Sequence, residues 1–170
     1  NRVVRITSGG WEYEADQRHA DLLIKAMGME RAKSVNTPSE DLKEWEQEEN
    51  AAVLIEKDAR EFRGLAARAN YLSVDRPDIQ YATKEIARHM ATPAEGSWVI
   101  MKRLGRYLKE HPRLVQEFRW QHNADRELCT YTDSDWAGDN ATRKSTSGGV
   151  AFSGSHSIKS RSSNQTIIAL

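Results

Sequence analysis

Cysteine is nearly absent from this sequence, because Cys129 is the single one among 170 residues. A lone cysteine excludes an internal disulfide framework and leaves no cysteine cluster for a structural zinc ion. Long apolar runs are also missing, since none approaches the ~20 residues that cross a bilayer. The sequence begins with Asn1, and its first residues lack the basic start, apolar centre and small-residue cleavage site that are typical of a signal peptide. We therefore expect an intracellular protein, cytoplasmic or nuclear, that has no membrane partner and is a piece of something longer.

Net charge is absent as well, because 25 basic residues balance 25 acidic ones. This balance removes the simplest argument for a nucleic-acid partner, which rests on an excess of positive charge. The distribution along the chain is uneven, however. Residues 39–63 hold 4 basic and 9 acidic side chains, whereas residues 64–126 hold 11 and 7. An acidic stretch that we expect to be a solvated linker thus precedes a basic region.

The first 38 residues have the pattern of a hairpin followed by a helix. A β-branched run at 3–6, a turn at 8–10 and aromatic residues just after it are typical of a β-hairpin. We expect a short amphipathic helix next, with Asp16 as its N-cap and Gly28 at its C-terminal stop.

Apolar residues at helical spacing predict three further helices, over 62–72, 79–90 and 98–108. Asp75 is expected to cap the second of them, with Pro77 in its first turn. From about residue 113 the period changes from 3.6 to 2, which indicates strands. The expected strands cover 114–120, 127–133, the region of Val150 and Phe152, 157–161 and 166–170. We expect them to form one antiparallel sheet, whose last strand ends inside an apolar run.

Asp133 and Asp135 are the best candidates for a chemical site. In a strand they would share a face, and two carboxylates on one face repel unless a cation lies between them. Mg²⁺ suits such a pair, because it keeps several waters and uses one or two carboxylates together with substrate phosphates. The alternative is that residues 135–139 form a solvent-exposed turn at the end of the strand. Spacing alone favours this alternative.

Two further segments carry basic residues that could contact phosphate. One side of the predicted helix over 98–108, including the residue just after it, is basic. It carries Lys102, Arg103, Arg106 and Lys109. The alternative is an ordinary solvated face that keeps the helices soluble. In TRKSTSGG, residues 142–149, Arg143 and Lys144 precede hydroxyls and glycines in a loop that could bind phosphate, or could simply be a hairpin loop.

Three stretches of the sequence resemble the Pol polyproteins of copia-type LTR retrotransposons. YTDSDWAGDNATRKSTSGG resembles the start of their ribonuclease H domain. YLSVDRPDIQYATKEIARHM with SWVIMKRLGRYLKEHP looks like the helical region after the polymerase palm, and YEADQRHADLLIKAMGMERAKSVNTP resembles the segment just before it. Together they cover nearly the whole chain apart from the acidic linker. The chain departs from the common K-S-W-S-S pattern at Arg161.

The resemblance implies an α+β fold: a helical thumb and connection bundle of a reverse transcriptase, then the first antiparallel strands of a truncated ribonuclease H-like fold. The implied parts are the end of the palm and thumb entry over 1–38, the acidic linker over 39–57, the helical thumb and connection over 58–125, and the ribonuclease H-like strands over 126–170. The implied partners are an RNA–DNA hybrid or duplex and the rest of the polyprotein.

By motif position, Asp133 matches the first catalytic carboxylate of ribonuclease H, a Mg²⁺ ligand, and Asp135 matches a motif position of less certain role. The polymerase Y-x-D-D motif and the ribonuclease H glutamate are absent from the sequence. We therefore expect nucleic-acid contact without turnover, from a chain whose intact parent is an RNA-directed DNA polymerase with ribonuclease H activity. The alternatives are a non-enzymatic interaction module, a decayed element remnant, or a Mg²⁺-dependent phosphatase or nuclease using Asp133, Asp135 and Asp139.

Overall fold

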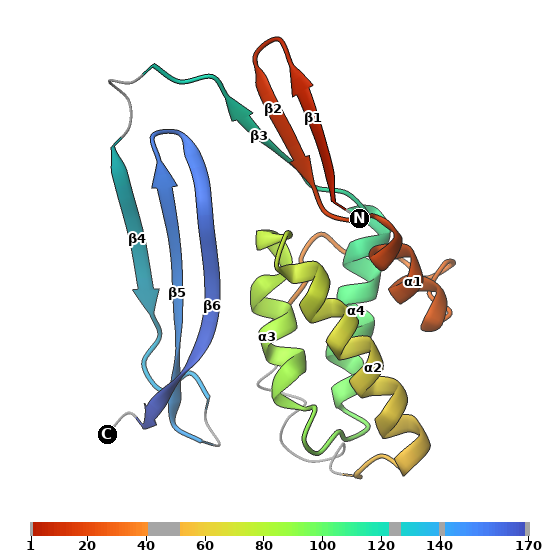
Figure 1. Ribbon diagram of the computed structural model, residues 1–170. Helices are drawn as coiled ribbons and strands as arrows, with labels where there is room; N and C mark the ends of the chain where they lie inside the picture. The colour runs from red at the N-terminus through yellow and green to blue at the C-terminus, as the bar shows by residue number, and fades with distance from the viewer. Residues whose placement is uncertain (1, 41–51, 123–126, 140–141, 169–170) are drawn as a thin grey trace. The chain divides into compact units, whose positions relative to one another are not determined.

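The computed structural model describes residues 2–40, 52–122, 127–139 and 142–168. In these ranges the chain forms four α-helices, one short 3-10 helix and two three-stranded sheets (Figure 1), which confirms the predicted α+β class. The chain divides into two compact units. The first consists mainly of residues 14–114, and the second combines residues 3–13 with residues 115–170.

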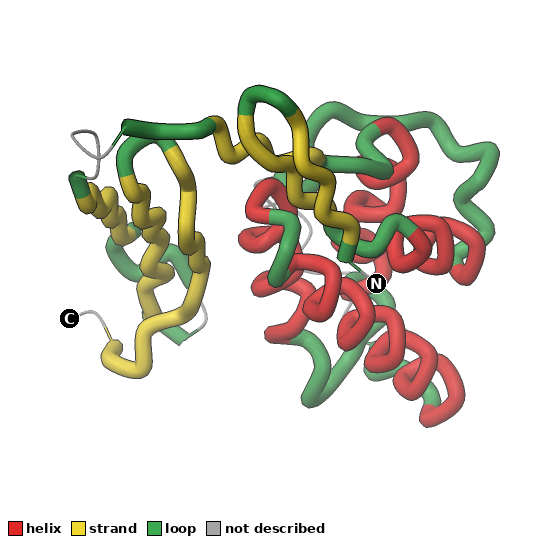
Figure 2. Tube along the Cα trace, turned by 45° about the horizontal axis from the view of Figure 1, so that its top comes forward, coloured by secondary structure: helices red, strands yellow, loops and turns green. Residues whose placement is uncertain are grey.

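The first unit contains all four α-helices, drawn in red in Figure 2. They are α1 (Arg18–Ala26), α2 (Glu56–Ser73), α3 (Gln80–Arg88) and α4 (Ser97–Glu110), with the 3-10 helix η1 (Pro77–Ile79) before α3. Their apolar stripes meet in one core, so the predicted helical periodicity is confirmed. Phe62 of α2, Ile86 of α3 and Leu104 of α4 are among its fully or almost fully buried members. None of the described helices is long and apolar enough to cross a membrane.

Two of the expected helix caps differ in the structure. Helix α1 begins at Arg18 rather than directly after Asp16, although the Asp16 carboxylate still accepts the Arg18 backbone N–H at 3.1 Å. Asp75 does not cap a helix; its carboxylate pairs with the Arg2 guanidinium at 2.8 Å, and Pro77 opens η1 instead of α3. The stop at Gly28 is confirmed by its left-handed φ of 62°.

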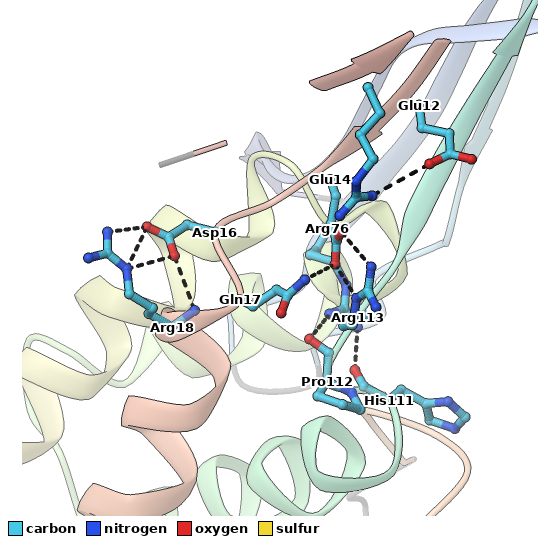
Figure 3. A network of polar contacts seen from close by, with 10 residues as sticks. Glu12, Glu14, Asp16, Gln17, Arg18, Arg76, His111, Pro112 and Arg113 are labelled. Carbon is cyan, nitrogen blue, oxygen red and sulfur yellow. Dashed lines mark hydrogen bonds and ion pairs between the residues drawn. The ribbon is translucent and has the colours of Figure 1, made fainter. Parts of the chain in front are cut away.

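A buried polar network fixes the C-terminal end of α4 (Figure 3). The Arg76 guanidinium, 1% exposed, donates to both carboxylate oxygens of Asp78 at 2.9 and 2.7 Å. It also donates to the carbonyls of His111 at 2.9 Å and Pro112 at 3.2 Å. Next to it, Arg113 forms a bidentate pair with the buried Glu14 at 2.6 and 2.9 Å. Charged groups so deeply buried are tolerated because each is paired.

The second unit contains both sheets. The first sheet has the order β1 (Val3–Thr7), β2 (Gly10–Glu14), β3 (Val115–Arg119), and the second has β4 (Leu128–Ser134), β5 (Lys144–Ser153), β6 (His156–Ile168). The expectation of one sheet after residue 113 is therefore wrong, because β3 pairs with the N-terminal hairpin. Trp11 stacks on Phe118 at 4.1 Å between ring centroids, and the Trp120 N–H donates to the Gly9 carbonyl at 2.9 Å. This aromatic contact gives β3 a partner far away in sequence.

Strand β6 is longer than expected. The segments predicted as two strands, over 157–161 and 166–170, belong to one continuous strand as far as Ile168, while 169–170 lie outside the described residues. The sheet β4–β5–β6 is antiparallel, and a register shift at Ala151/Phe152 leaves Ile158 without a direct partner. A bulge of this kind lets a strand continue through a local irregularity.

Among the described residues, the buried apolar side chains of the core all lie in the first unit, between Ala15 and Leu108. In β4, β5 and β6 the buried described residue is Ser145, whereas Leu128 and Tyr131 are 70% and 62% exposed. The sheet β4–β5–β6 therefore presents side chains to solvent on both faces. The acidic linker expected over 39–57 lies mostly outside the described residues; its end, residues 52–55, bridges to residues 93–95, and α2 starts within it.

Candidate nucleic-acid and metal site

Asp133 lies near the end of β4, exposed and opposite Gly148 of β5. The predicted alternation along this strand is confirmed, because Cys129 and Tyr131 lie on one face together. Their side-chain contact raises the pKa of Tyr131, and the Tyr131 ring meets Phe152 of β5 edge to face at 6.0 Å. Asp133 follows at the same two-residue interval, so its carboxylate is on this face.

Asp135 lies just beyond the strand and closes the following loop. Its Oδ1 accepts the Thr146 backbone N–H at 2.7 Å and the Gly138 N–H at 3.4 Å. The carboxylate also fills the space beside Gly138, where a Cβ would stand 2.3 Å from Asp135 Oδ2. This is the turn described by the alternative interpretation of residues 135–139, and it gives Asp135 a local structural role.

Asp139, the third acidic residue of this region, is also engaged within the loop. Its carboxylate accepts the backbone N–H and the hydroxyl of Thr142, and its backbone carbonyl accepts the Arg143 N–H at 2.7 Å. Within the described ranges, no three His, Cys, Asp or Glu side chains come together as potential metal ligands. Asp133 could supply one oxygen ligand to Mg²⁺, which otherwise would need water and substrate phosphates.

The segment 142–149, expected as a loop, is mostly strand. Strand β5 begins at Lys144; Thr146 to Gly149 pair with β6, and Ser147 to Gly149 also pair with β4, so they are not arranged around an anion. Arg143 remains in the turn, with a left-handed φ of 58°. Buried Ser145 accepts the Ala137 N–H at 3.0 Å through its hydroxyl, so this hydroxyl supports the loop.

The basic residues of α4 contact the segment that follows α1. Arg106 donates to the Lys33 carbonyl at 2.6 Å, and Lys109 donates to the Ala32 carbonyl at 2.7 Å. Arg103 donates to the Thr37 hydroxyl at 2.8 Å and pairs with the Glu40 carboxylate. Lys102 is exposed, and the structure gives it no hydrogen bond or ion pair with a described residue.

These contacts hold residues 32–40 along α4. A carbonyl accepts a hydrogen bond without neutralising the cation, so Arg106 and Lys109 keep their charge in this arrangement. Glu40, by contrast, offsets the charge of Arg103. The basic side of α4 is therefore partly an attachment surface for the chain's own backbone, which helical spacing alone did not reveal.

Two basic residues were not considered as a site from the sequence. Lys159 and Arg161 stand two apart in β6 and are both exposed. The signal was present, since alternation in a strand puts such a pair on one face. Only the structure shows the register between β5 and β6, and therefore which residues lie beside this pair.

Comparison with known proteins finds relatives in Arabidopsis thaliana. The chain is 33% identical over 108 residues to the Retrovirus-related Pol polyprotein from transposon RE2, and 34% identical over 108 residues to that from transposon RE1. Each match covers 64% of this chain and 7% of the polyprotein. An uncharacterized mitochondrial protein, AtMg00810, is 28% identical over 154 residues, which is 89% of this chain and 61% of that protein. No protein-family model and no solved structure matches the chain.

The chain is therefore similar, over 108 residues, to retrovirus-related Pol polyproteins of transposons. These named relatives confirm the resemblance to Pol polyproteins that the sequence motifs indicated. The chain spans only 7% of the length of the RE1 and RE2 polyproteins, so it corresponds to a small part of each.

Proposed function

We propose that this chain is the part of a copia-type Pol polyprotein that joins the thumb and connection of a reverse transcriptase to the beginning of its ribonuclease H domain. In this role it contacts an RNA–DNA hybrid or duplex without turnover of its own. The intact parent would copy RNA into DNA and degrade the RNA strand. Similarity to the RE1 and RE2 Pol polyproteins supports the assignment of this chain to a polyprotein of that kind.

The observation that best supports nucleic-acid contact is the basic side of α4. Lys102, Arg106 and Lys109 follow one another at intervals of four and three residues, so they share one side of the helix, with Arg103 beside them. Lys102 is exposed, and the hydrogen bonds of Arg106 and Lys109 to carbonyls leave their charges available. A row of cations of this kind can neutralise phosphates along a backbone.

The absence of turnover follows from the acidic residues. Asp133, which by resemblance matches the first ribonuclease H carboxylate, is exposed, whereas Asp135 and Asp139 form hydrogen bonds within their own loop. Hydrolysis with two metal ions needs several oxygen ligands to hold both ions. Mg²⁺ would therefore bind weakly to this chain, through Asp133 and water.

The test is fluorescence anisotropy of a labelled RNA–DNA hybrid at several salt concentrations. If Lys102, Arg106 and Lys109 each neutralise a phosphate, the logarithm of the association constant should fall with the logarithm of salt concentration with a slope of about −2.7, from about −0.9 for each contact. Lys102→Gln should reduce the slope by about 0.9, because it removes one contact without disturbing residues 32–40. Lys57→Gln on α2 removes an equally exposed charge elsewhere and should leave the slope unchanged.

Four outcomes would contradict the proposal. Binding that does not depend on salt, or no binding to the hybrid at low salt, would exclude phosphate contact. An equal effect of Lys102→Gln and Lys57→Gln would exclude α4 as the contact surface. Mg²⁺-dependent cleavage of the hybrid that Asp133→Asn abolishes would overturn the absence of turnover.

A further inference from the structure

The antiparallel register of β4, β5 and β6 places side chains in rows across one face of the sheet. Residues directly opposite each other in an antiparallel pair share a face, and so do residues two apart along a strand. Two neighbouring rows each contain a threonine, a small residue and a cation. They are Thr130, Ala151 and Lys159, followed by Thr132, Gly149 and Arg161. We call this surface the Lys159/Arg161 face.

The small residues in the middle strand leave the Lys159/Arg161 face shallow. Arg161 extends over Gly149, because a Cβ at Gly149 would stand 3.6 Å from Arg161 Nε and 3.7 Å from Thr132 Cγ2. The guanidinium group thus lies across the sheet towards β4. A backbone placed on this face would meet cations from β6 and hydroxyls from β4, with no large side chain between them.

The charge of this face has one sign. Among the described residues of the three strands, the acidic one is Asp133, which pairs with Gly148 in the alternate rows and so lies on the opposite face. The two cations of the Lys159/Arg161 face are therefore not offset by a carboxylate on it. Thr130 and Thr132 are exposed, so their hydroxyls are accessible as donors.

We propose that the Lys159/Arg161 face binds the phosphate backbone of a nucleic-acid strand that runs along β6. Lys159 and Arg161 each contact one phosphate, and the hydroxyls of Thr130 and Thr132 donate hydrogen bonds beside them. The inference rests on the proposed function for its ligand class, but it assigns a second surface, separate from α4 and on the opposite face of the sheet from Asp133.

A regular polyanion fits this surface better than a lipid or an acidic protein. The two cations repeat at two residues along an extended strand, about 6.7 Å apart, which suits a ligand whose charges also repeat. The two rows contain no large apolar side chain that would insert into a membrane, as interfacial binding requires. Hydroxyls and cations on a flat surface are typical contacts to sugar and phosphate.

The test is anisotropy with a labelled single-stranded oligonucleotide and the full chain. The double variant Lys159→Gln/Arg161→Gln should weaken binding by roughly tenfold at low salt and reduce the salt slope by about 1.4, from about 0.7 for each contact on a single strand. Arg161→Lys should retain most of the affinity, because it keeps the charge. The matched control Lys25→Gln/Lys57→Gln removes the same charge from α1 and α2, where no effect is expected.

A second pair of variants tests the face itself. Ser163 and Ser162 are neighbours in β6 whose side chains lie on opposite faces, opposite Ser147 and Gly148 respectively. Ser163→Asp adds a negative charge to the Lys159/Arg161 face and should weaken binding several-fold more than Ser162→Asp. Equal effects of the two substitutions would overturn the inference, because the weaker binding would then result from the change in net charge and not from the face on which the new charge lies.

The outcomes separate this inference from the proposed function. Suppose that the unaltered chain binds nucleic acid. If Lys102→Gln then weakens binding and the Lys159/Arg161 double variant does not, the inference fails and the role of α4 stands. If the double variant weakens binding and Lys102→Gln does not, the inference is supported and the role of α4 fails. If the double variant loses binding to phosphatidylserine vesicles as strongly as to the oligonucleotide, the assignment to nucleic acid is wrong.

Discussion

Replacement of Arg76 by alanine should destabilise the first unit strongly. The Arg76 side chain is 1% exposed and makes hydrogen bonds to Asp78, His111 and Pro112. Removing one partner of a buried ion pair costs about 3–5 kcal/mol, because the other partner is left unpaired. Asp78 is 21% exposed and keeps a hydrogen bond from the Tyr107 hydroxyl at 2.9 Å, which moves the cost to the lower end of that range. We expect a loss of about 3 kcal/mol.

Urea unfolding followed by far-UV circular dichroism measures this loss, since the described α-helices all lie in the first unit. With a denaturant slope of about 2 kcal/mol per molar urea, the midpoint should fall by about 1.5 M. Arg60→Ala is the matched control: Arg60 pairs with Glu56 at 3.8 Å on the exposed side of α2. Such a surface pair contributes less than about 1 kcal/mol, so its midpoint should change little.

The result that would refute this reasoning is a midpoint for Arg76→Ala equal to that of Arg60→Ala. It would mean that Asp78 and the two carbonyls find other partners at no cost. Arg76→Lys provides an intermediate test, because lysine keeps the charge but cannot form the bidentate pair. Its midpoint should fall between that of the unaltered chain and that of Arg76→Ala.

Three further predictions concern other parts of the chain. Gly10→Ala should disturb the packing of β3, because the new Cβ would stand 2.1 Å from the Phe118 carbonyl oxygen, and the near-UV circular dichroism spectrum should change. Gly9→Ala is the control: its Cβ would meet nothing within 4 Å, so the spectrum should stay the same. The hydrogen bond from the Arg18 side chain lowers the pKa of Asp16, so the ionised Asp16 stabilises the fold above pH about 4, and this stabilisation is lost as the pH falls. Asp16→Asn should flatten the acid dependence of the urea midpoint. An unchanged acid dependence would contradict this prediction. Burial, and secondly the Asp78 carboxylate, raise the pKa of Tyr107, so the stabilisation by this tyrosine is complete below pH about 10 and declines as the pH rises further. Tyr107→Phe should reduce this decline in the free energy of unfolding. An identical decline in the variant would exclude Tyr107 as its source.

Local patterns allowed the sequence to predict most individual elements. The helices follow from apolar residues at intervals of three and four, such as Met101, Leu104 and Leu108. The β1–β2 hairpin follows from a β-branched run before a turn at Ser8 and Gly9, with aromatic residues after it. Caps were predicted less well, since Asp75 is taken by an ion pair with Arg2 from a distant part of the chain.

Candidate chemistry was harder to predict than secondary structure. The sequence placed Asp133 and Asp135 together by alternation, but Asp135 lies past the end of β4 and bonds to its own loop. It also grouped the cations of α4 on one side of the helix by their spacing. It could not reveal that Arg103, Arg106 and Lys109 contact residues 32–40, because helical periodicity specifies which side chains share a face and not what covers them.

The sequence by itself determined the α+β class, the helical stripes and the motifs that relate this chain to retrotransposon Pol polyproteins. Tertiary structure alone decided that β3 joins the N-terminal hairpin, that Arg76 is buried, and that Lys159 and Arg161 lie beside Ala151 and Gly149, respectively. The physical reason is the range of the interactions. A helix satisfies its backbone hydrogen bonds within a few residues, so its signal is local, whereas a strand edge or a buried cation takes a partner from any part of the chain.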